Sequence, residues 1–256
     1  MKIRRWGQFE KNIRLAGREL LSELDRYPGS VLVAGCQRSG TTVATEVVNS
    51  SGVFGSHAIT QDTELDAALI LSGHTSVAEG RYCFQTTYLN ERFIEYFQHA
   101  NFQLIWVLRQ PVPVVRSMLF NWSRFSLNRL YAGVGAEHLD KVGGAEKRFW
   151  NDQYVSRLKK ACASYIGKIS QTQQLYDGLP GDQILVVDYD DLTGMQKDAT
   201  TRRIFEFLNL DFNASHSKIF TGSTMTRKKD PLSSDEVDFV EDACRPTYLA
   251  ARSCLM

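Results

Sequence analysis

The feature that constrains this chain most is a short apolar run that leads directly into a glycine-containing loop and then a helical pattern. Val31–Ala34 has the composition of a buried strand, and Thr42–Asn49 has the apolar spacing of a helix. Between them, Gly35 and Gly40 let the backbone turn so that its amides face an anion, and a helix N-terminus adds about half a positive charge. The segment therefore predicts a phosphate-binding loop between a strand and a helix.

Further strands and helices alternate along the 256 residues, without an internal repeat or a low-complexity linker. This order predicts an α/β fold with three layers, in which helices cover both faces of a central parallel sheet and ligands bind at the carboxyl ends of the strands. We expect one domain over residues 1–256. Strands are predicted at Val31–Ala34, Tyr82–Phe84, Gln103–Leu108 and Ile184–Val187. Further helices are predicted at Glu10–Leu24, Asp62–Leu71, Asn90–His99, Pro111–Phe120, Glu146–Tyr176, Arg202–Leu208 and Asp235–Ala243.

The amino-acid composition limits the classes of partner that we expect. Lys plus Arg is 30 against 29 for Asp plus Glu, so we expect neither nucleic acid nor an acidic membrane surface as a partner, and any anion site must be local. Residues 1–26 are punctuated by charges, and no run of about 18 apolar residues occurs, so a cytoplasmic protein is expected. The five cysteines form no Cys-x-x-Cys pair, which predicts reduced, mostly buried thiols and no metal site. Nothing in the sequence indicates an oligomeric state.

The loop departs from the Walker A pattern at one position. Both glycines and Thr42 are in place, but Thr41 stands where the phosphate-binding Lys would be, which disfavours a kinase or ATPase. The cation is instead Arg38, inside the loop. Here the chain resembles the PAPS-dependent sulfotransferases of the small, stand-alone, small-molecule type, whose 5′-phosphosulfate loop reads Lys or Arg, Ser, Gly, Thr, Thr. The resemblance implies 3′-phosphoadenosine 5′-phosphosulfate (PAPS) as donor and adenosine 3′,5′-bisphosphate (PAP) as product. It also implies donor contacts at Gln37, Arg38, Ser39, Gly40, Thr41 and Thr42.

A second anion site is predicted where the strand Gln103–Leu108 runs into Arg109. Pro111 and Ser117 follow Arg109 by two and eight positions, and no acid occurs between residues 110 and 136, so the local field is positive. The resemblance assigns Arg109 and Ser117 to the 3′-phosphate of the donor.

Two more segments resemble the family. The strand end Val186–Leu192 is similar to the family's Tyr-Glu-Asp-Leu element, which implies that Tyr189 reaches the adenine side; packing as a half-buried aromatic is an equal interpretation. Arg227 and Lys228 resemble an Arg-Lys-Gly element that grips the 3′-phosphate. Because Lys229 replaces the glycine, only these two residues carry the assignment.

The family pattern breaks at the general base. Gln85, Thr86 and Thr87 stand where cytosolic members have Lys, Thr and His, so the base must lie elsewhere, and a positioned base contributes about 10²- to 10⁴-fold in rate. We favour Glu64, since other branches such as the tyrosyl-protein sulfotransferases have a Glu at the start of the corresponding helix. His57 is next, and the remaining candidates are Asp62 and Asp66. Solvated acids at a helix start are the competing interpretation.

Together these residues predict an enzyme that transfers the sulfuryl group of PAPS to a hydroxyl or nitrogen of a small molecule, with Arg38 stabilising transition-state charge and no metal. Residues 43–80 contain five acids and no Lys or Arg, which favours a cationic acceptor, such as a guanidinium alkaloid of the saxitoxin type made in secondary metabolism. Two alternatives stay open: a P-loop kinase for a nucleoside or small molecule, and a non-catalytic nucleotide-binding module.

Overall fold

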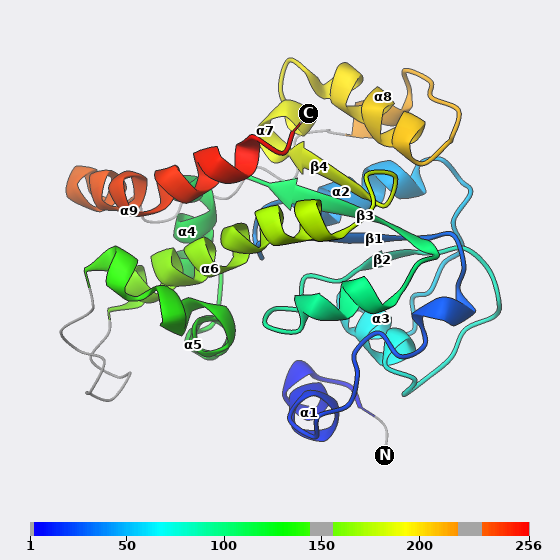
Figure 1. Cartoon of the computed structure of the whole chain (residues 1–256), viewed down its shortest axis with the longest axis horizontal. Helices are drawn as coiled ribbons and strands as arrows, with labels where there is room; N and C mark the ends of the chain where they lie inside the picture. The colour runs from blue at the N-terminus through cyan, green and yellow to red at the C-terminus, as the bar shows by residue number, and fades with distance from the viewer. Residues whose placement is uncertain (1–2, 144–155, 220–231, 256) are drawn as a thin grey trace.

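The computed structural model describes residues 3–143, 156–219 and 232–255. Its centre is a four-stranded sheet in the order β2-β1-β3-β4, and every neighbouring pair is parallel (Figure 1). The strands are β1 Ser30–Gly35, β2 Cys83–Gln85, β3 Phe102–Leu108 and β4 Ile184–Asp188. The predicted parallel sheet is confirmed.

Alternation along the strands separates two apolar cores. On β1, Val31 and Val33 join the core that α2 and α8 cover, whereas Leu32 and Ala34 join the core beneath α4, α6 and α9. Helices thus lie on both faces of the sheet, as Figure 1 shows, and the predicted three-layer α/β fold is confirmed. These helices are α2 Thr41–Asn49, α4 Pro111–Phe120, α6 Arg157–Gly178, α8 Lys197–Phe207 and α9 Ser234–Arg252.

The remaining helices are short. The α-helices among them are α1 Trp6–Phe9, α3 Thr63–Leu71, α5 Arg124–Leu130 and α7 Tyr189–Thr193. The π-helical turns are η1 Glu10–Arg14 and η4 Tyr131–Gly135. The 3₁₀ turns are η2 Leu24–Arg26, η3 Phe93–Gln98, η5 Ala136–His138, η6 Asp140–Val142 and η9 His216–Ile219. The sequence did not predict α5 or α7, and the helix expected at Asn90–His99 is only a 3₁₀ turn.

The helix predicted over Glu10–Leu24 is wrong beyond Arg14. Gly17 takes a left-handed backbone with φ of 72°, which ends the helical path. The buried carboxylate of Glu95 then accepts the backbone N–H groups of Leu20 and Leu21, at 2.6 and 2.9 Å. These amides are therefore satisfied by a distant side chain instead of a helical carbonyl.

Two other helices have different ends from those predicted. The helix expected from Glu146 begins at Arg157, because Ser156 is extended and its hydroxyl accepts the N–H of Lys159 at 3.2 Å; residues 144–155 lie outside the described part. The closing helix continues past Ala243 and Pro246 to Arg252, and its buried face packs on the core through Val240, Cys244, Tyr248 and Ala251.

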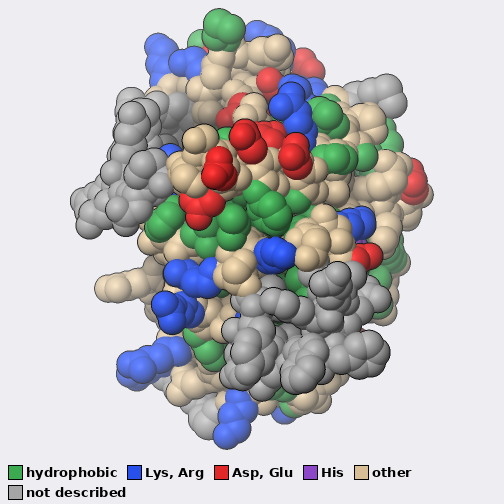
Figure 2. Space-filling model, turned by 90° about the vertical axis from the view of Figure 1, so that its left-hand side faces the viewer, with side chains coloured by type: hydrophobic (Ala, Val, Ile, Leu, Met, Phe, Trp, Pro, Cys, Tyr) green, Lys and Arg blue, Asp and Glu red, His purple; other side chains and the backbone are tan. Residues whose placement is uncertain are grey.

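Charge is distributed in local patches. Figure 2 shows acidic side chains gathered in one band, with basic side chains below them, on the end of the molecule where α9 begins. The first half of α9 contributes Asp235, Glu236, Asp238, Glu241 and Asp242. The near-neutral total therefore conceals separate acidic and basic surfaces.

All five cysteines are buried free thiols, as predicted. Within the described ranges, no helix is long and apolar enough to cross a membrane. Those ranges also contain no group of three or more His, Cys, Asp or Glu side chains arranged to hold a metal ion.

Candidate active site

The phosphate loop connects β1 to α2 at the carboxyl edge of the sheet, as predicted. Arg38 has φ of 73°, a left-handed conformation that side-chain-bearing residues rarely adopt and that is often found at functional sites. Gly40 has φ of 99°, and a Cβ there would lie 2.1 Å from the Tyr189 ring. The loop is thus held in a shape that depends on glycine at one position and stores strain at another.

The loop contacts the second predicted phosphate element directly. Arg38 Nε donates to Ser117 Oγ at 2.9 Å, and Arg109 Nη1 donates to the Arg38 carbonyl at 3.2 Å. Asn121 Nδ2 also donates to Ser117 Oγ, at 3.2 Å, which leaves the Ser117 hydroxyl hydrogen for another acceptor. The structure therefore brings Arg38, Arg109 and Ser117 together, with the Arg38 side chain turned toward α4.

Tyr189, the first residue of α7 directly after β4, closes this cluster. Its ring is only 9% exposed, packs against Gly40, and lies 4.1 Å beneath the Arg109 guanidinium. The Arg109 carbonyl accepts a hydrogen bond from Tyr165 Oη at 2.7 Å, which fixes the strand end from α6. Tyr189 therefore packs on the phosphate loop; a contact with adenine stays a prediction.

The cluster has the properties of an anion site. Within the described ranges, Ser39 Oγ and Arg109 Nε are buried without a hydrogen-bond partner, and both can donate. Burial lowers the pKa of both the Arg38 and the Arg109 guanidinium, yet arginine stays charged in proteins. A ligand with two anionic ends fits these unsatisfied donors. The two basic residues predicted to join them, Arg227 and Lys228, lie outside the described residues.

Gln37 turns away from this cluster. Its Nε2 donates to the Thr87 carbonyl at 2.8 Å and to Asn90 Oδ1 at 2.7 Å, while its Oε1 is buried without a partner. The side chain predicted to bind donor instead lines the neighbouring cavity, so any donor contact from this residue would be made by its backbone.

Glu64, the favoured base, lies in the first turn of α3. Thr87 Oγ1 donates a short hydrogen bond to Glu64 Oε1, and Gln85 Nε2 donates to Oε2 at 3.3 Å. Burial raises the pKa of Glu64 to about 7, although the Thr87 hydrogen bond acts in the opposite direction. The carboxyl group therefore changes protonation near neutral pH. The two residues that replace the family's Lys and His hold Glu64 in place.

Gln85 also connects Glu64 to the phosphate loop. Its Nε2 lies 3.1 Å from Thr41 Oγ1, and its Oε1 accepts from Thr42 Oγ1 at 3.3 Å. One neutral amide thus joins the candidate base to both threonines at the start of α2. The sequence marked Gln85 only as a missing lysine and gave no sign of this bridge.

The other candidate bases have different surroundings. Asp66 is fully buried and accepts from the backbone N–H groups of Ile59 and Thr60 and from Thr60 Oγ1, at 2.7–2.9 Å. It shapes the loop before α3, so the expectation that Asp66 faces an acceptor is wrong. Asp62 caps α3 by accepting from Leu65 N at 3.0 Å, and it also accepts from Trp6 Nε1 at 2.8 Å.

A cavity of about 290 Å³ contains His57, and another of about 330 Å³ contains Glu64 and Asp62; the two have no lining residue in common. We call the larger one the aromatic cavity, because four of its lining side chains are Trp6, Tyr88, Trp122 and Phe125. The Tyr88 hydroxyl is buried without a hydrogen-bond partner. The sequence did not predict this wall, whose residues come from segments more than thirty positions apart.

Charge pairing in the aromatic cavity is uneven. Arg14 donates to Glu91, with Nε and Oε1 2.9 Å apart, and Arg129 forms an ion pair with Glu10. By contrast, neither Asp62 nor Glu64 has a lysine or arginine nitrogen within 4 Å among the described residues. The cations of this cavity are paired with acids, whereas Asp62 and Glu64 have no cationic partner in the described part of the chain.

Neither a family model nor a curated protein matches this sequence. Solved structures do match the fold. A sulfotransferase domain from the curacin biosynthetic pathway has a TM-score of 0.53 at 13% identity and covers 90% of this chain and 98% of its own. A sulfotransferase from Alicyclobacillus acidocaldarius has a TM-score of 0.51 at 14% identity, covering 88% and 95%. The sulfotransferase domain of the Synechococcus PCC 7002 olefin synthase has a TM-score of 0.51 at 11% identity, covering 89% and 94%. The chain has the sulfotransferase fold, as the sequence predicted.

Proposed function

We propose that this chain is a PAPS-dependent sulfotransferase, built as one domain, that sulfates a hydroxyl or nitrogen of a small molecule and releases PAP. The observation that carries the proposal is the contact between a titratable base and an anion-binding loop: Glu64 is joined through Gln85 to Thr41 and Thr42. A base and a donor-binding loop must meet in this way for a proton to leave the acceptor while the acceptor attacks the donor.

The residues divide into donor-binding and proton-accepting groups. The backbone of the phosphate loop and the N-terminus of α2 would hold the 5′ end, and Arg109 and Ser117 the 3′-phosphate. PAPS supplies an activated sulfuryl group. Glu64 takes the proton at a carboxylate oxygen as the acceptor oxygen or nitrogen bonds to sulfur and the bond from sulfur to the leaving phosphate breaks. Arg38 and loop amides stabilise the charge that develops, without a requirement for a metal.

The acceptor would lie in the aromatic cavity and would carry a positive charge. Aromatic faces attract cations, and Asp62, a carboxylate of this cavity that is not the proposed base, adds negative charge. A compact guanidinium or amine satisfies both requirements, and a saxitoxin-type alkaloid is one such molecule. A cytoplasmic location stays a prediction, to be tested by cell fractionation.

Thermal shift with adenine nucleotides tests the donor assignment. PAP should raise the melting temperature more than AMP, because only PAP fills both predicted phosphate sites. Equal shifts for PAP and AMP would contradict the 3′-phosphate site. A larger shift with ATP and magnesium would favour a kinase, and binding of PAP with no turnover of any acceptor would favour a non-catalytic module.

An acceptor screen tests the charge preference. We expect PAP release with guanidinium and amine compounds to exceed that with phenols, steroids and anionic sugars. Asp62→Asn should raise the KM for the cationic acceptor. Glu79→Gln, which removes an exposed acid outside the cavity, should leave this KM unchanged. A preference for neutral phenols that Asp62→Asn does not change would contradict a cationic acceptor.

A further inference from the structure

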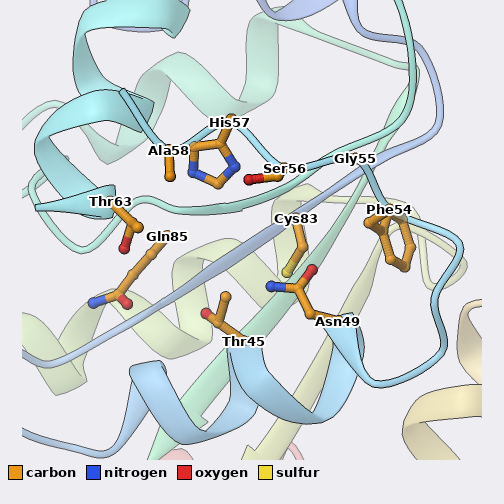
Figure 3. Close-up of a pocket in the computed structure, with 10 residues that line it drawn as sticks. All are labelled: Thr45, Asn49, Phe54, Gly55, Ser56, His57, Ala58, Thr63, Cys83 and Gln85. Atoms are coloured by element: carbon orange, nitrogen blue, oxygen red, sulfur yellow. The ribbon is translucent and has the colours of Figure 1, made fainter. Parts of the chain in front are cut away.

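The His57 cavity, of about 290 Å³, lies beside the Gln85–Glu64 contact and plays no part in the proposed reaction. Figure 3 shows its walls: the outer face of α2, the loop before α3, and β2. Gln85 contributes to this cavity and donates to Glu64, which lines the aromatic cavity. The lining residues are Thr45, Asn49, Phe54, Gly55, Ser56, His57, Ala58, Thr63, Cys83 and Gln85.

His57 gives this cavity an unsatisfied hydrogen-bonding group. The residue is 8% exposed, and its Nε2 is buried without a hydrogen-bond partner in the part of the chain that the structure describes. The imidazole packs on Phe84 at 4.8 Å and near Tyr82 at 6.2 Å between ring centroids, and Figure 3 shows the ring directed into the space above α2 and Gln85. Burial lowers its pKa, although a hydrogen bond to the backbone of Thr63 and nearby Asp66 raise it, so a neutral imidazole faces the cavity at neutral pH. A buried polar atom of this kind costs free energy until a ligand or water satisfies it.

The chemistry of the walls limits what can bind. Among the described residues, no Lys, Arg, Asp or Glu lines the cavity, so a charged ligand would lose its hydration without a compensating charge from them. An apolar ligand would leave His57 Nε2 unsatisfied. The polar lining consists of neutral hydroxyls and amides, which both donate and accept, and Thr45 already donates to the Thr41 carbonyl at 2.9 Å, leaving its lone pairs available. Phe54 adds one ring at the edge, where Figure 3 places it.

We propose that the His57 cavity is a binding site for a neutral, hydroxyl-rich group about the size of one sugar ring, with His57 Nε2 as its central contact. Hydroxyl groups match a lining that both donates and accepts. The group belongs either to a free polyol or to a hydroxylated part of the acceptor. Because Gln85 lines this cavity and donates to Glu64, an occupant here contacts the residue that holds the proposed base.

Ligand-observed NMR with methyl glucoside, xylitol and myo-inositol tests the site. Wild-type protein should bind at least one of these probes at millimolar concentration. His57→Leu should weaken binding about 3- to 10-fold, the value of one hydrogen bond, and His57→Gln should restore part of it. Asn101→Ala, an exposed amide at the opposite edge of the sheet, is the matched control and should have no effect.

An unchanged circular dichroism spectrum and a cooperative thermal transition show that each variant is folded. If His57→Leu does not fold, Ser56→Trp replaces it, because Ser56 is exposed and a large ring there fills the cavity. Absence of binding by all three probes, or equal binding by wild type and the cavity variants, would overturn the site. This outcome is independent of PAP binding and turnover, so it is distinguishable from failure of the proposed reaction.

Incubation with PAPS separates the two sources. PAP release with a probe, lost in His57→Leu, supports the site and identifies the hydroxylated group as part of an acceptor. Binding without PAP release supports a site for a free polyol. PAP release that survives in His57→Leu would place the probe in the aromatic cavity and overturn the proposal.

Discussion

The donor-binding cluster and the aromatic cavity adjoin each other but are built in opposite ways. The first is made of short segments that follow β1, β3 and β4. There Arg109 bonds to the backbone carbonyl of Arg38, and Arg109 Nε and Ser39 Oγ have no hydrogen-bond partner among the described residues. The second is assembled from side chains of distant segments, and its cations are already paired with acids. The donor side is thus prepared for an anion before it binds. The acceptor side instead leaves negative charge and aromatic faces available.

The largest effect is expected on the acceptor side, from removal of the proposed base, Glu64. Glu64→Gln keeps the shape of the side chain but cannot take a proton, so turnover should fall about 10²- to 10⁴-fold while PAP affinity stays unchanged. Steady-state kinetics and PAP titration measure the two effects. Glu79→Gln is the control, and near-normal turnover of Glu64→Gln would transfer the role of base to Asp62 or His57.

Removing the loop cation should affect the donor side during the reaction. Arg38→Ala is expected to lower kcat about 10²- to 10³-fold, as for the loss of one oxyanion-type donor. Arg18→Ala removes an exposed arginine elsewhere and serves as control. If Arg38→Ala weakens PAP binding and leaves kcat unchanged, Arg38 binds the donor through Ser117 and has no role in the transition state.

Ser117→Ala tests whether the donor-binding cluster contacts both phosphate positions of PAP. A hydrogen bond to a charged group is worth about 1.5–3 kcal/mol, so PAP affinity should fall about 10- to 100-fold. AMP affinity should stay the same, because AMP lacks the 3′-phosphate. Calorimetric titration of both nucleotides measures the difference, and an equal loss for both would mean that Ser117 only supports Arg38.

Gln85, which joins the two sides, should influence the pH dependence of kcat/KM. Glu64 acts as a base only when deprotonated, so kcat/KM should rise with pH through about 7, the pKa of its carboxyl group. Gln85→Lys places an ammonium beside the carboxylate, which lowers its pKa and should move this limb down by about one pH unit. Gln85→Met, which is neutral, should not lower the limb. An unchanged profile in Gln85→Lys would contradict Glu64 as the titrating group.

This contrast explains what the sequence could predict. The phosphate loop and the Arg109–Ser117 element each occupy a continuous stretch of sequence, so their spacing and the family resemblance indicated them, and a parallel sheet brings strand ends together. The order of strands and helices was sufficient for the fold. Helix ends that depend on distant partners were not predictable: Leu20 leaves the helical path because of Glu95, which is 75 residues away.

The acceptor side was only partly predictable for the same reason. Asp62, Glu64 and Asp66 look alike in sequence, yet one caps a helix, one faces a cavity and one is buried under a loop. Their roles depend on which face of α3 each occupies and on what packs against it. The aromatic wall was missed because Trp6 and Trp122 meet only in three dimensions.

The backbone of Arg38 has a consequence for how this protein could evolve or be engineered. A non-glycine residue in the left-handed region costs about 1–2 kcal/mol, so a glycine at this position would fold more favourably. Arg38→Gly should therefore resist urea better than Arg38→Ala by about 1 kcal/mol, although both lack the guanidinium and should be equally slow. Equal unfolding midpoints would show that the loop relaxes without cost. The residue thus represents a trade of conformational stability for charge placement, and selection for a more stable protein would be expected to remove the cation that the proposed reaction needs.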